Sequence, residues 1–215
     1  SDTLSTAVLI PAFNEADGVE RVVRTAVAAE LGPVLVVDDG SKDDTAAVAE
    51  AAGARVLRLK RNVGKGGAVA AGVRELDEDV VVLLDADLLG LSVAHLQELA
   101  EPVASGRYDM TRGVFKGGRW STTAAQKMLP QLNGQRAILR SLLLGLEDLA
   151  SSRYGIEVVI TEASRHEEWR VKDVRMEDVT QVTKEEKRGF LKGALLRVKM
   201  YSDIVRTLLG GRRDE

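Results

Sequence analysis

The sequence has no cysteine, no long apolar run and little net charge, and each absence excludes a class of protein. Without cysteine there are no disulfides or thiolate metal sites, so any metal must be bound by oxygen atoms or by the two histidines. A net charge of −3 over 215 residues argues against binding nucleic acid by overall electrostatic attraction. No apolar stretch approaches the roughly 18 residues of a spanning helix, and the first residues lack a signal-peptide pattern, so we expect a cytoplasmic protein.

The remaining composition is typical of a soluble globular protein with one substantial core, with 45% hydrophobic and 29% charged residues. The charge is unevenly spread along the chain. Residues 184–215 contain nine Lys or Arg and five Asp or Glu, a local charge of +4, which leaves −7 for residues 1–183. We therefore distinguish an acidic body from a basic end.

Short apolar stretches alternate with helical stretches of 10–15 residues through the first half of the chain. This alternation predicts βαβ units and a mostly parallel sheet flanked by helices. The expected strands are residues 7–10, 34–37, 55–59, 80–84 and 108–115. Three expected helices follow N-caps: one from Asn14 to about residue 27, one from Ser41 to about residue 52 and one from Ser92 to about residue 104. A fourth begins at the glycine-rich loop of residues 62–67 and ends near residue 76.

The second half has a different pattern. We expect helices over roughly residues 122–145 and 147–165, a strand at 169–174, and a last helix from a capping box at Thr183 and Glu186 to about residue 209.

Asp85 and Asp87 follow five apolar residues, 80–84, that fit a strand buried on both faces. Carboxylates at positions i and i+2 lie on the same side of an extended chain, at the sheet edge where ligands bind. Two such oxygen ligands suit a hard divalent cation, which in turn suits a diphosphate. The alternative is a pair of acids that begins a turn.

Polar clusters also follow the other three expected strands of the first half. They are residues 11–15 (Pro-Ala-Phe-Asn-Glu), residues 38–41 (Asp-Asp-Gly-Ser) and Lys65 within residues 62–67. Right-handed crossovers bring these strand ends to one rim, which favours a shared ligand site. Read singly, Asn14 and Ser41 are helix caps, Gly64 and Gly66 serve a turn, and Lys65 is solvated.

Three common ligand sites lack their motifs here. No G-x-G-x-x-G follows the first strand, Gly64-Lys65-Gly66 lacks the Walker A spacing, and no serine nucleophile elbow is present.

Residues 8–15, 36–45, 62–66 and 85–87 together resemble, in order and spacing, the family 2 glycosyltransferases of the GT-A fold. Residues 132–137 and 154–157 resemble the acceptor-side region of glucosyl-3-phosphoglycerate synthases and their mannosylglycerate synthase relatives. The resemblance implies an α/β, Rossmann-like GT-A domain over residues 1–183. Within it, residues 1–115 form a nucleotide-sugar-binding half and residues 116–183 an acceptor half, followed by a basic amphipathic helix in residues 184–215.

The same resemblance implies a donor site. In this site Pro11, Ala12, Asn14 and Glu15 hold the nucleotide, and Asp39 or its neighbour Asp38 accepts a hydrogen bond from the base. Lys65 binds the nucleotide or its diphosphate, and Asp85 contacts the ribose or the sugar. Asp87 is the main ligand of Mg²⁺ or Mn²⁺. The metal would stabilise the departing nucleoside diphosphate.

The resemblance also implies an acceptor site that includes Gly134, Gln135, Arg136 and Arg119, with Glu157 near the acceptor or the reacting sugar. Glu157 would be the general base of an inverting enzyme or a positioning group in a retaining one; a helix acid favoured by the dipole is the alternative.

The relatives complete their metal site with a late histidine, which residues 178–183 lack. Either Gln181 supplies a carbonyl oxygen there, beside Asp85 and Asp87, or water fills the position. We interpret His95 and His166 as surface residues.

Two further segments leave alternatives open. Lys116, Arg119 and Trp120 lie in a glycine-rich stretch that is either a water-excluding lid or a plain exposed loop. Residues 187–209 form a basic amphipathic helix, which is expected either on an anionic membrane surface or packed on its own domain or in a homodimer.

The predicted function is metal-dependent transfer of a hexose from a nucleotide diphosphate sugar, first UDP-glucose and second GDP-mannose, to a small phosphorylated or lipid-phosphate acceptor. A nucleotide-sugar-binding module without catalysis remains open. So does a phosphoacceptor signalling domain using Asp38, Asp39 and Lys65, although that class is shorter and has no need of Asp85 and Asp87.

Overall fold

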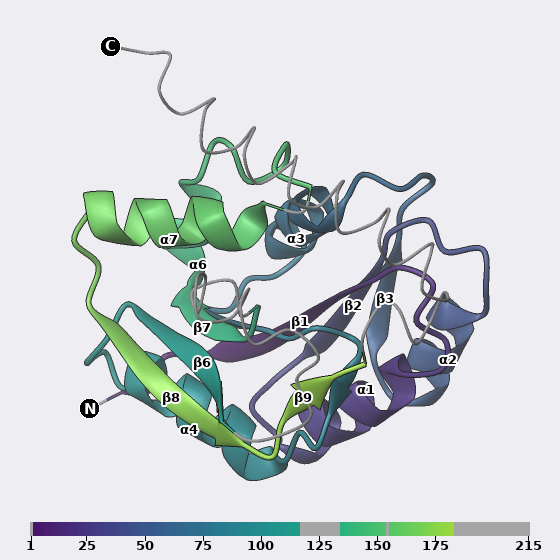
Figure 1. The fold of residues 1–215 in the computed structure, drawn as a ribbon, viewed down its shortest axis with the longest axis horizontal. Coiled ribbons are helices and arrows are strands. Elements are labelled where there is room, and N and C mark those ends of the chain that lie inside the picture. The colour runs from purple at the N-terminus through teal and green to yellow at the C-terminus, as the bar shows by residue number, and fades with distance from the viewer. Residues whose placement is uncertain (1, 117–133, 154, 183–215) are drawn as a thin grey trace.

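The computed structural model describes residues 2–116, 134–153 and 155–182, and it forms a seven-stranded sheet between two layers of helices (Figure 1). The strands are β1 (Thr6–Ala12), β2 (Val34–Asp38), β3 (Arg55–Arg58), β4 (Val80–Leu83), β5 (Leu88–Leu89), β6 (Met110–Lys116), β7 (Arg136–Leu139), β8 (Val171–Glu177) and β9 (Thr180–Gln181). The helices are α1 (Val19–Ala28), α2 (Thr45–Ala51), α3 (Lys65–Arg74), α4 (Val93–Ala104), α6 (Arg140–Leu144) and α7 (Ile156–His166).

The main sheet has the order β3-β2-β1-β4-β7-β6-β8, and β5 pairs with β9 in a separate two-stranded sheet. Strands β1 to β4 are parallel, with Val8 opposite Val34 and Thr6 opposite Val80. Strand β7 runs antiparallel to both β4 and β6, while β8 is parallel to β6. The expected mostly parallel sheet is confirmed, and β7 is the reversed strand within the described sheet.

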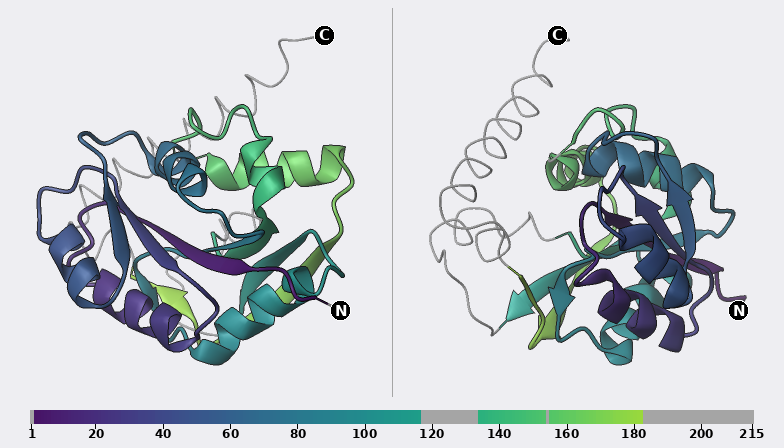
Figure 2. Two further views of the ribbon diagram at one scale, coloured as in Figure 1. Left: turned by 180° about the vertical axis from the view of Figure 1, so that it is seen from behind. Right: turned by 90° about the vertical axis from the view of Figure 1, so that its right-hand side faces the viewer.

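Alternate residues of β1 face the two helix layers, because successive side chains of a strand point to opposite faces. Val8 and Ile10 pack in a core with residues of α1, α2 and α4, whereas Ala7 and Leu9 pack with residues of α3, α6 and α7 (Figure 2). Strand β4 is buried along its whole length. Burial on both faces explains why these strands are continuous apolar runs.

Two predicted helix caps are wrong. Helix α1 begins after Gly18 and α2 after Asp44, so neither Asn14 nor Ser41 is an N-cap. The Asn14 backbone has φ 52°, its N–H donates to Ser41 Oγ (2.9 Å), and its Oδ1 accepts from the Lys42 N–H (2.9 Å). These polar side chains bond across the turns that follow β1 and β2 instead of capping a helix.

The cap at Ser92 is confirmed. The Ser92 side chain accepts from the His95 N–H, and the His95 ring bonds back to the Ser92 backbone. His95, interpreted as a surface residue, is half-buried and belongs to this capping box.

The expected helix over residues 122–145 is wrong at residues 136–139, which form β7. Ala137 and Ile138 are fully buried, because β7 fills the space between β4 and β6. The expected helix over 147–165 is shorter, and only α7 is helical within it. The strand expected at 169–174 begins two residues later and continues to Glu177 as β8, and the β5–β9 pair is an addition to the prediction.

Several predicted features lie outside the described residues: Arg119 and Trp120 of the suggested lid, Tyr154, the capping box at Thr183 and Glu186, and the basic helix of residues 187–209. Within the ranges that the structure describes, no helix combines the length and apolarity needed to cross a bilayer.

Candidate functional site

The carboxyl ends of β1, β2 and β4 meet at one edge of the sheet, as the sequence predicts. The Asp39 N–H donates to the Ala12 carbonyl, which joins the ends of β1 and β2. A Cβ added to Gly18 would lie 3.0 Å from the Ala86 carbonyl oxygen, which places the turn after β1 against the Asp85–Asp87 segment. The polar clusters after these strands therefore share one rim.

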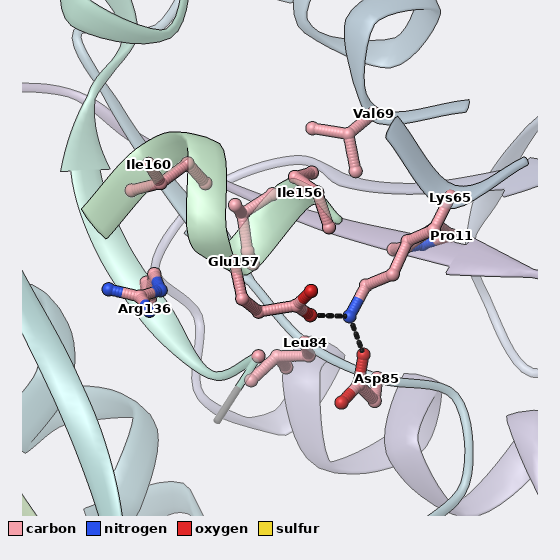
Figure 3. A pocket seen from close by; sticks show the side chains of 11 residues that line it. Pro11, Lys65, Val69, Leu84, Asp85, Arg136, Ile156, Glu157 and Ile160 are labelled. Carbon is pink, nitrogen blue, oxygen red and sulfur yellow. Dashed lines mark hydrogen bonds and ion pairs between the residues drawn. The ribbon is translucent and has the colours of Figure 1, made fainter. Parts of the chain in front are cut away.

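Lys65 lies at the centre of this rim, between Asp85 and Glu157 (Figure 3). Its Nζ is 2.7 Å from Asp85 Oδ1 and contacts Glu157 Oε1. The side chains are 26%, 15% and 11% exposed for Lys65, Asp85 and Glu157. They come from the first residue of α3, the end of β4 and the first turn of α7, so one ammonium joins the two halves of the chain.

Lys65 and Asp85 stabilise each other in their ionised forms. Burial alone would lower the pKa of Lys65, but the two carboxylates outweigh it and hold that pKa above its usual range. Burial would raise the pKa of Asp85, but the Lys65 ammonium and the hydrogen bonds from Gln135 and Gln181 hold it below its usual range. The Lys65–Asp85 ion pair is therefore fully formed near neutral pH.

Gly134 lets the chain pass close to this cluster. A Cβ at this position would lie 2.7 Å from Lys65 Nζ and 2.8 Å from Asp85 Oδ2, closer than real side chains allow. Gln135 follows it, and its Nε2 donates to Asp85 Oδ2 at 2.8 Å. Of the predicted acceptor residues, Gly134 and Gln135 thus border the Lys65–Asp85 ion pair.

Gln181 reaches the two aspartates through the β5–β9 pair, in which Leu88 lies opposite Gln181. Its Nε2 donates to Asp85 Oδ2 (2.5 Å) and to Asp87 Oδ1 (3.3 Å). The Val182 N–H also donates to the Asp87 carbonyl (3.3 Å). The sequence predicts Gln181 beside these carboxylates, and the structure places it there.

The chemistry of this group fits a hard divalent cation. Two carboxylates and a carboxamide offer oxygen ligands of the kind that Mg²⁺ and Mn²⁺ bind. Gln181 presents its amide nitrogen to the aspartates, so ligation would require the amide to turn and present Oε1. In the described part of the chain, no three His, Cys, Asp or Glu side chains gather into a metal-binding cluster, so water or the substrate would have to complete the coordination.

The two aspartates after β2 have different roles in the structure. Asp39 is buried and accepts from the backbone N–H groups of Val63 (2.8 Å) and Gly64 (3.0 Å) and from Asn62 Nδ2 (3.0 Å). Burial raises its pKa, and these backbone hydrogen bonds oppose the rise. Asp39 thus fixes the loop that leads to Lys65. Asp38 Oδ1 accepts from the Ser41 N–H (3.0 Å).

Arg136 lies at the other end of the pocket from Lys65 (Figure 3). Its guanidinium is within hydrogen-bond reach of Thr161 Oγ1 (3.3 Å), and the residue is 1% exposed. Burial lowers its pKa to about 10, so it stays charged at neutral pH. Because Arg136 is buried, an acceptor substrate cannot reach its guanidinium in this conformation. Its role in acceptor binding stays a prediction.

Pro11 and the apolar side chains Val69, Leu84, Ile156 and Ile160 line the rest of this pocket. Ala12 ends β1, and Asn14 and Glu15 lie on the turn that follows it. The Asn14 N–H donates to Ser41 Oγ, and the Glu15 N–H donates to Oγ1 of Thr45, the first residue of α2 (2.9 Å). The turn that carries these predicted nucleotide-binding residues is therefore tied to the turn after β2.

Sequence reasoning missed the support that residues 150–153 give to the Lys65 loop. Arg153 Nη2 donates to Asn62 Oδ1 (3.0 Å), and the Gly66 N–H donates to the Arg153 carbonyl (3.0 Å). A Cβ on Gly66 would lie 2.0 Å from Ser152 Oγ. The only sequence signal was the glycine at position 66, which indicates a close approach without identifying its partner.

Residues 7–164 match the sequence model of the family described as Glycosyl transferase family 2. The undecaprenyl-phosphate 4-deoxy-4-formamido-L-arabinose transferase of Sodalis glossinidius (strain morsitans) is 35% identical over 139 residues, which cover 59% of this chain and 42% of that protein. Glycosyltransferase AglD of Haloferax volcanii is 33% identical over 126 residues, which cover 53% of this chain and 19% of that protein. The chain thus matches less than half the length of these curated relatives.

The fold is similar to that of glucosyl-3-phosphoglycerate synthase from Mycobacterium tuberculosis, crystallised with Mn²⁺, UDP and glucosyl-3-phosphoglycerate. The TM-score is 0.77 at 23% identity, over 96% of this chain and 79% of that one. Crystals of the same synthase with Mn²⁺, UDP and phosphoglyceric acid match equally well, at 24% identity. At this identity the likeness shows the fold alone, and it confirms the expected GT-A architecture.

Proposed function

Because the chain belongs to glycosyl transferase family 2, we propose that it transfers a hexose from a nucleotide diphosphate sugar to a phosphorylated acceptor. One observation carries the proposal most directly. The Lys65 ammonium and the Asp85 and Asp87 carboxylates lie together at the carboxyl edge of the sheet, where they can meet a diphosphate and its metal ion.

The donor would lie along the rim. Lys65 is the first residue of α3, so its ammonium and the N-terminus of that helix both attract the diphosphate. Both oxygens of Asp39 already accept hydrogen bonds from the Asn62–Gly64 loop. Asp38 is therefore the better candidate to accept from an imide N–H of the base, while Pro11, Ala12, Asn14 and Glu15 form the wall for the nucleotide.

Asp87, Asp85 and Gln181 would hold a divalent cation, with Asp87 as the main ligand, as the family resemblance implies. Gln181 already lies within hydrogen-bond reach of both carboxylates. The cation supplies charge stabilisation for the departing nucleoside diphosphate. Lys65 adds a second positive charge on the same leaving group. Asp85 keeps the ammonium in place. Its contact with a ribose or sugar hydroxyl would require Gln135 or Gln181 to release Oδ2.

Glu157 is our candidate for the general base toward the acceptor hydroxyl. It is buried in the first turn of α7, across Lys65 from Asp85. Gly134 and Gln135 border the same space, so an acceptor there would approach the sugar from the Glu157 side.

The names of similar proteins support two kinds of acceptor. The relative from Sodalis glossinidius is named for undecaprenyl phosphate, a lipid phosphate, and the synthase crystals contain UDP, Mn²⁺ and phosphoglyceric acid. We place UDP-glucose first and GDP-mannose second as donors. A lipid-phosphate acceptor would bring this domain to a membrane surface.

A thermal-shift screen tests the proposal. We expect UDP, and GDP more weakly, to raise the melting temperature only when Mg²⁺ or Mn²⁺ is present, with stabilisation that follows mass action in nucleotide concentration. AMP and NAD serve as controls that lack a pyrimidine or guanine diphosphate. Failure of every pyrimidine and guanine diphosphate to stabilise the protein would contradict the transferase proposal. Donor binding without turnover for any phosphorylated acceptor would instead favour the binding module.

A further inference from the structure

One ammonium serves both sides of the site. Lys65 contacts Asp85, which belongs to the proposed donor side, and Glu157, which belongs to the proposed acceptor side. A donor diphosphate carries at least two negative charges and would need the same ammonium. A lysine has a flexible stem and three hydrogen-bond donors, but only one positive charge to share among these anions.

The two carboxylates do not depend on Lys65 equally. Asp85 Oδ2 also accepts from Gln135 Nε2 and Gln181 Nε2, at 2.8 and 2.5 Å. Glu157 has Lys65 as its one hydrogen-bonded or ion-pair partner among the described residues. If Lys65 turns toward a diphosphate, Asp85 keeps two hydrogen-bond donors. Glu157 loses its hydrogen-bonded ion pair and keeps only the longer-range attraction of the buried Arg136 guanidinium.

We propose that Glu157 and the donor diphosphate compete for the Lys65 ammonium, so that donor binding releases Glu157 toward the acceptor. This inference rests on the proposed function and adds a coupling between its two half-sites. In the absence of donor, Lys65 neutralises Glu157 and the carboxylate is held away from the acceptor. With donor bound, Glu157 is free to accept a hydrogen bond from the acceptor hydroxyl.

The competition has a consequence that can be measured without catalysis. A carboxylate that binds Lys65 in the free protein weakens diphosphate binding, and removing its charge removes that cost. Glu157→Gln should therefore bind UDP in the presence of Mg²⁺ more tightly than the unmodified protein, by about fivefold to thirtyfold, which corresponds to about 1–2 kcal/mol. Isothermal titration calorimetry measures this affinity directly.

The matched control is Glu162→Gln on the same helix. Glu162 is exposed and lies on α7 about one turn after Glu157. Its ion-pair partner is Arg165. This variant should bind UDP as the unmodified protein does. Equal or weaker UDP binding by Glu157→Gln, with intact thermal unfolding, would overturn the competition.

A double-mutant cycle separates competition from a change in the shape of the site. In a Lys65→Met background there is no ammonium to compete for, so Glu157→Gln should leave the residual UDP affinity unchanged. An equal gain in both backgrounds would overturn the inference. If the unmodified protein binds neither UDP nor GDP, the proposed function fails; if it binds UDP and Glu157→Gln gains nothing, only the competition fails.

Discussion

Replacing Lys65 by Met should lower the free energy of unfolding by about 3 kcal/mol near pH 7. The ammonium is the cation shared by Asp85 and Glu157, whose side chains are 15% and 11% exposed. Methionine fills a similar volume but has no charge, so the two buried carboxylates would face each other without a cation between them. We take the lower end of the usual cost of an uncompensated buried charge, because Gln135 and Gln181 still donate to Asp85.

The loss should depend on pH in a defined direction. The folded-state pKa of Asp85 lies below 3.8, so its contribution is present above that value and disappears as the pH falls through the lowered pKa. The folded-state pKa of Lys65 lies above 10.5, so its contribution is complete below that value and is lost only as the pH rises through the raised pKa. The difference between the two proteins should therefore be largest from about pH 5 to pH 9 and shrink below pH 4.

Urea denaturation in EDTA from pH 3 to pH 9 measures this difference without bound metal. Lys60→Met is the matched control, because Lys60 is exposed and lies in the connection from β3 that leads to Lys65 at the start of α3. Its effect should stay below about 0.5 kcal/mol at every pH. A similar small effect for Lys65→Met, or a loss that does not shrink in acid, would show that the ion cluster contributes little to stability.

Replacing Asp87 by Asn should lower the turnover number by about 100-fold or more while the fold stays intact. Asparagine keeps the shape and can still accept from Gln181 Nε2, which lies 3.3 Å from Asp87 Oδ1. It removes the negative charge that we assign to the main ligand of the cation. A weakly held cation no longer neutralises the diphosphate as its bond to the sugar breaks, and losing one such stabilising group commonly costs 10²–10³ in rate.

The assay compares turnover of the donor found by the thermal-shift screen, as a function of Mn²⁺ concentration. Asp77→Asn is the matched control, since Asp77 is exposed and precedes β4 at the opposite end from Asp87. The control should keep full activity. Unchanged turnover and unchanged Mn²⁺ dependence in Asp87→Asn would remove this residue from the metal site.

The strands that build the rim could be predicted because their signal is local. Strand β4 is buried along its length and reads as an uninterrupted apolar run, and the polar residues after it can only belong to a strand end. The shared edge of β1, β2 and β4 followed from alternation with helices, since right-handed crossovers bring the ends of parallel strands to one rim. The sequence thus predicted that Asp38, Lys65 and Asp85 lie near this edge, although Asp38 is the last residue of β2 and Lys65 the first of α3.

Features that depend on distant pairing could not be predicted. Residues 136–139 precede the leucines of α6 and are compatible with a helix in isolation, but β4 and β6 on either side make them a strand. Asn14 and Ser41 have the local pattern of helix caps, yet they bond to each other across 27 residues. Local patterns carry no information about such partners.

The same limit applied to the site. Lys65 and Glu157 are 92 residues apart, and no pattern around either indicates the other. Gln181 was expected beside Asp85 and Asp87 only through the family resemblance, whereas the β5–β9 pair that brings it there had no sequence signal. Sequence thus predicted which residues carry charge at the rim, and the structure added how one lysine connects them.

A crystal of the protein with UDP and Mn²⁺, measured at a wavelength where manganese scatters anomalously, tests the central claim most directly. We expect one manganese peak in coordinating contact with Asp87 and the UDP diphosphate, with Lys65 Nζ in hydrogen-bond contact with a diphosphate oxygen. Manganese remote from Asp85 and Asp87, or UDP bound elsewhere, for example beside Arg61 and Arg153 at the open pocket next to the Asn62 loop, would contradict the account.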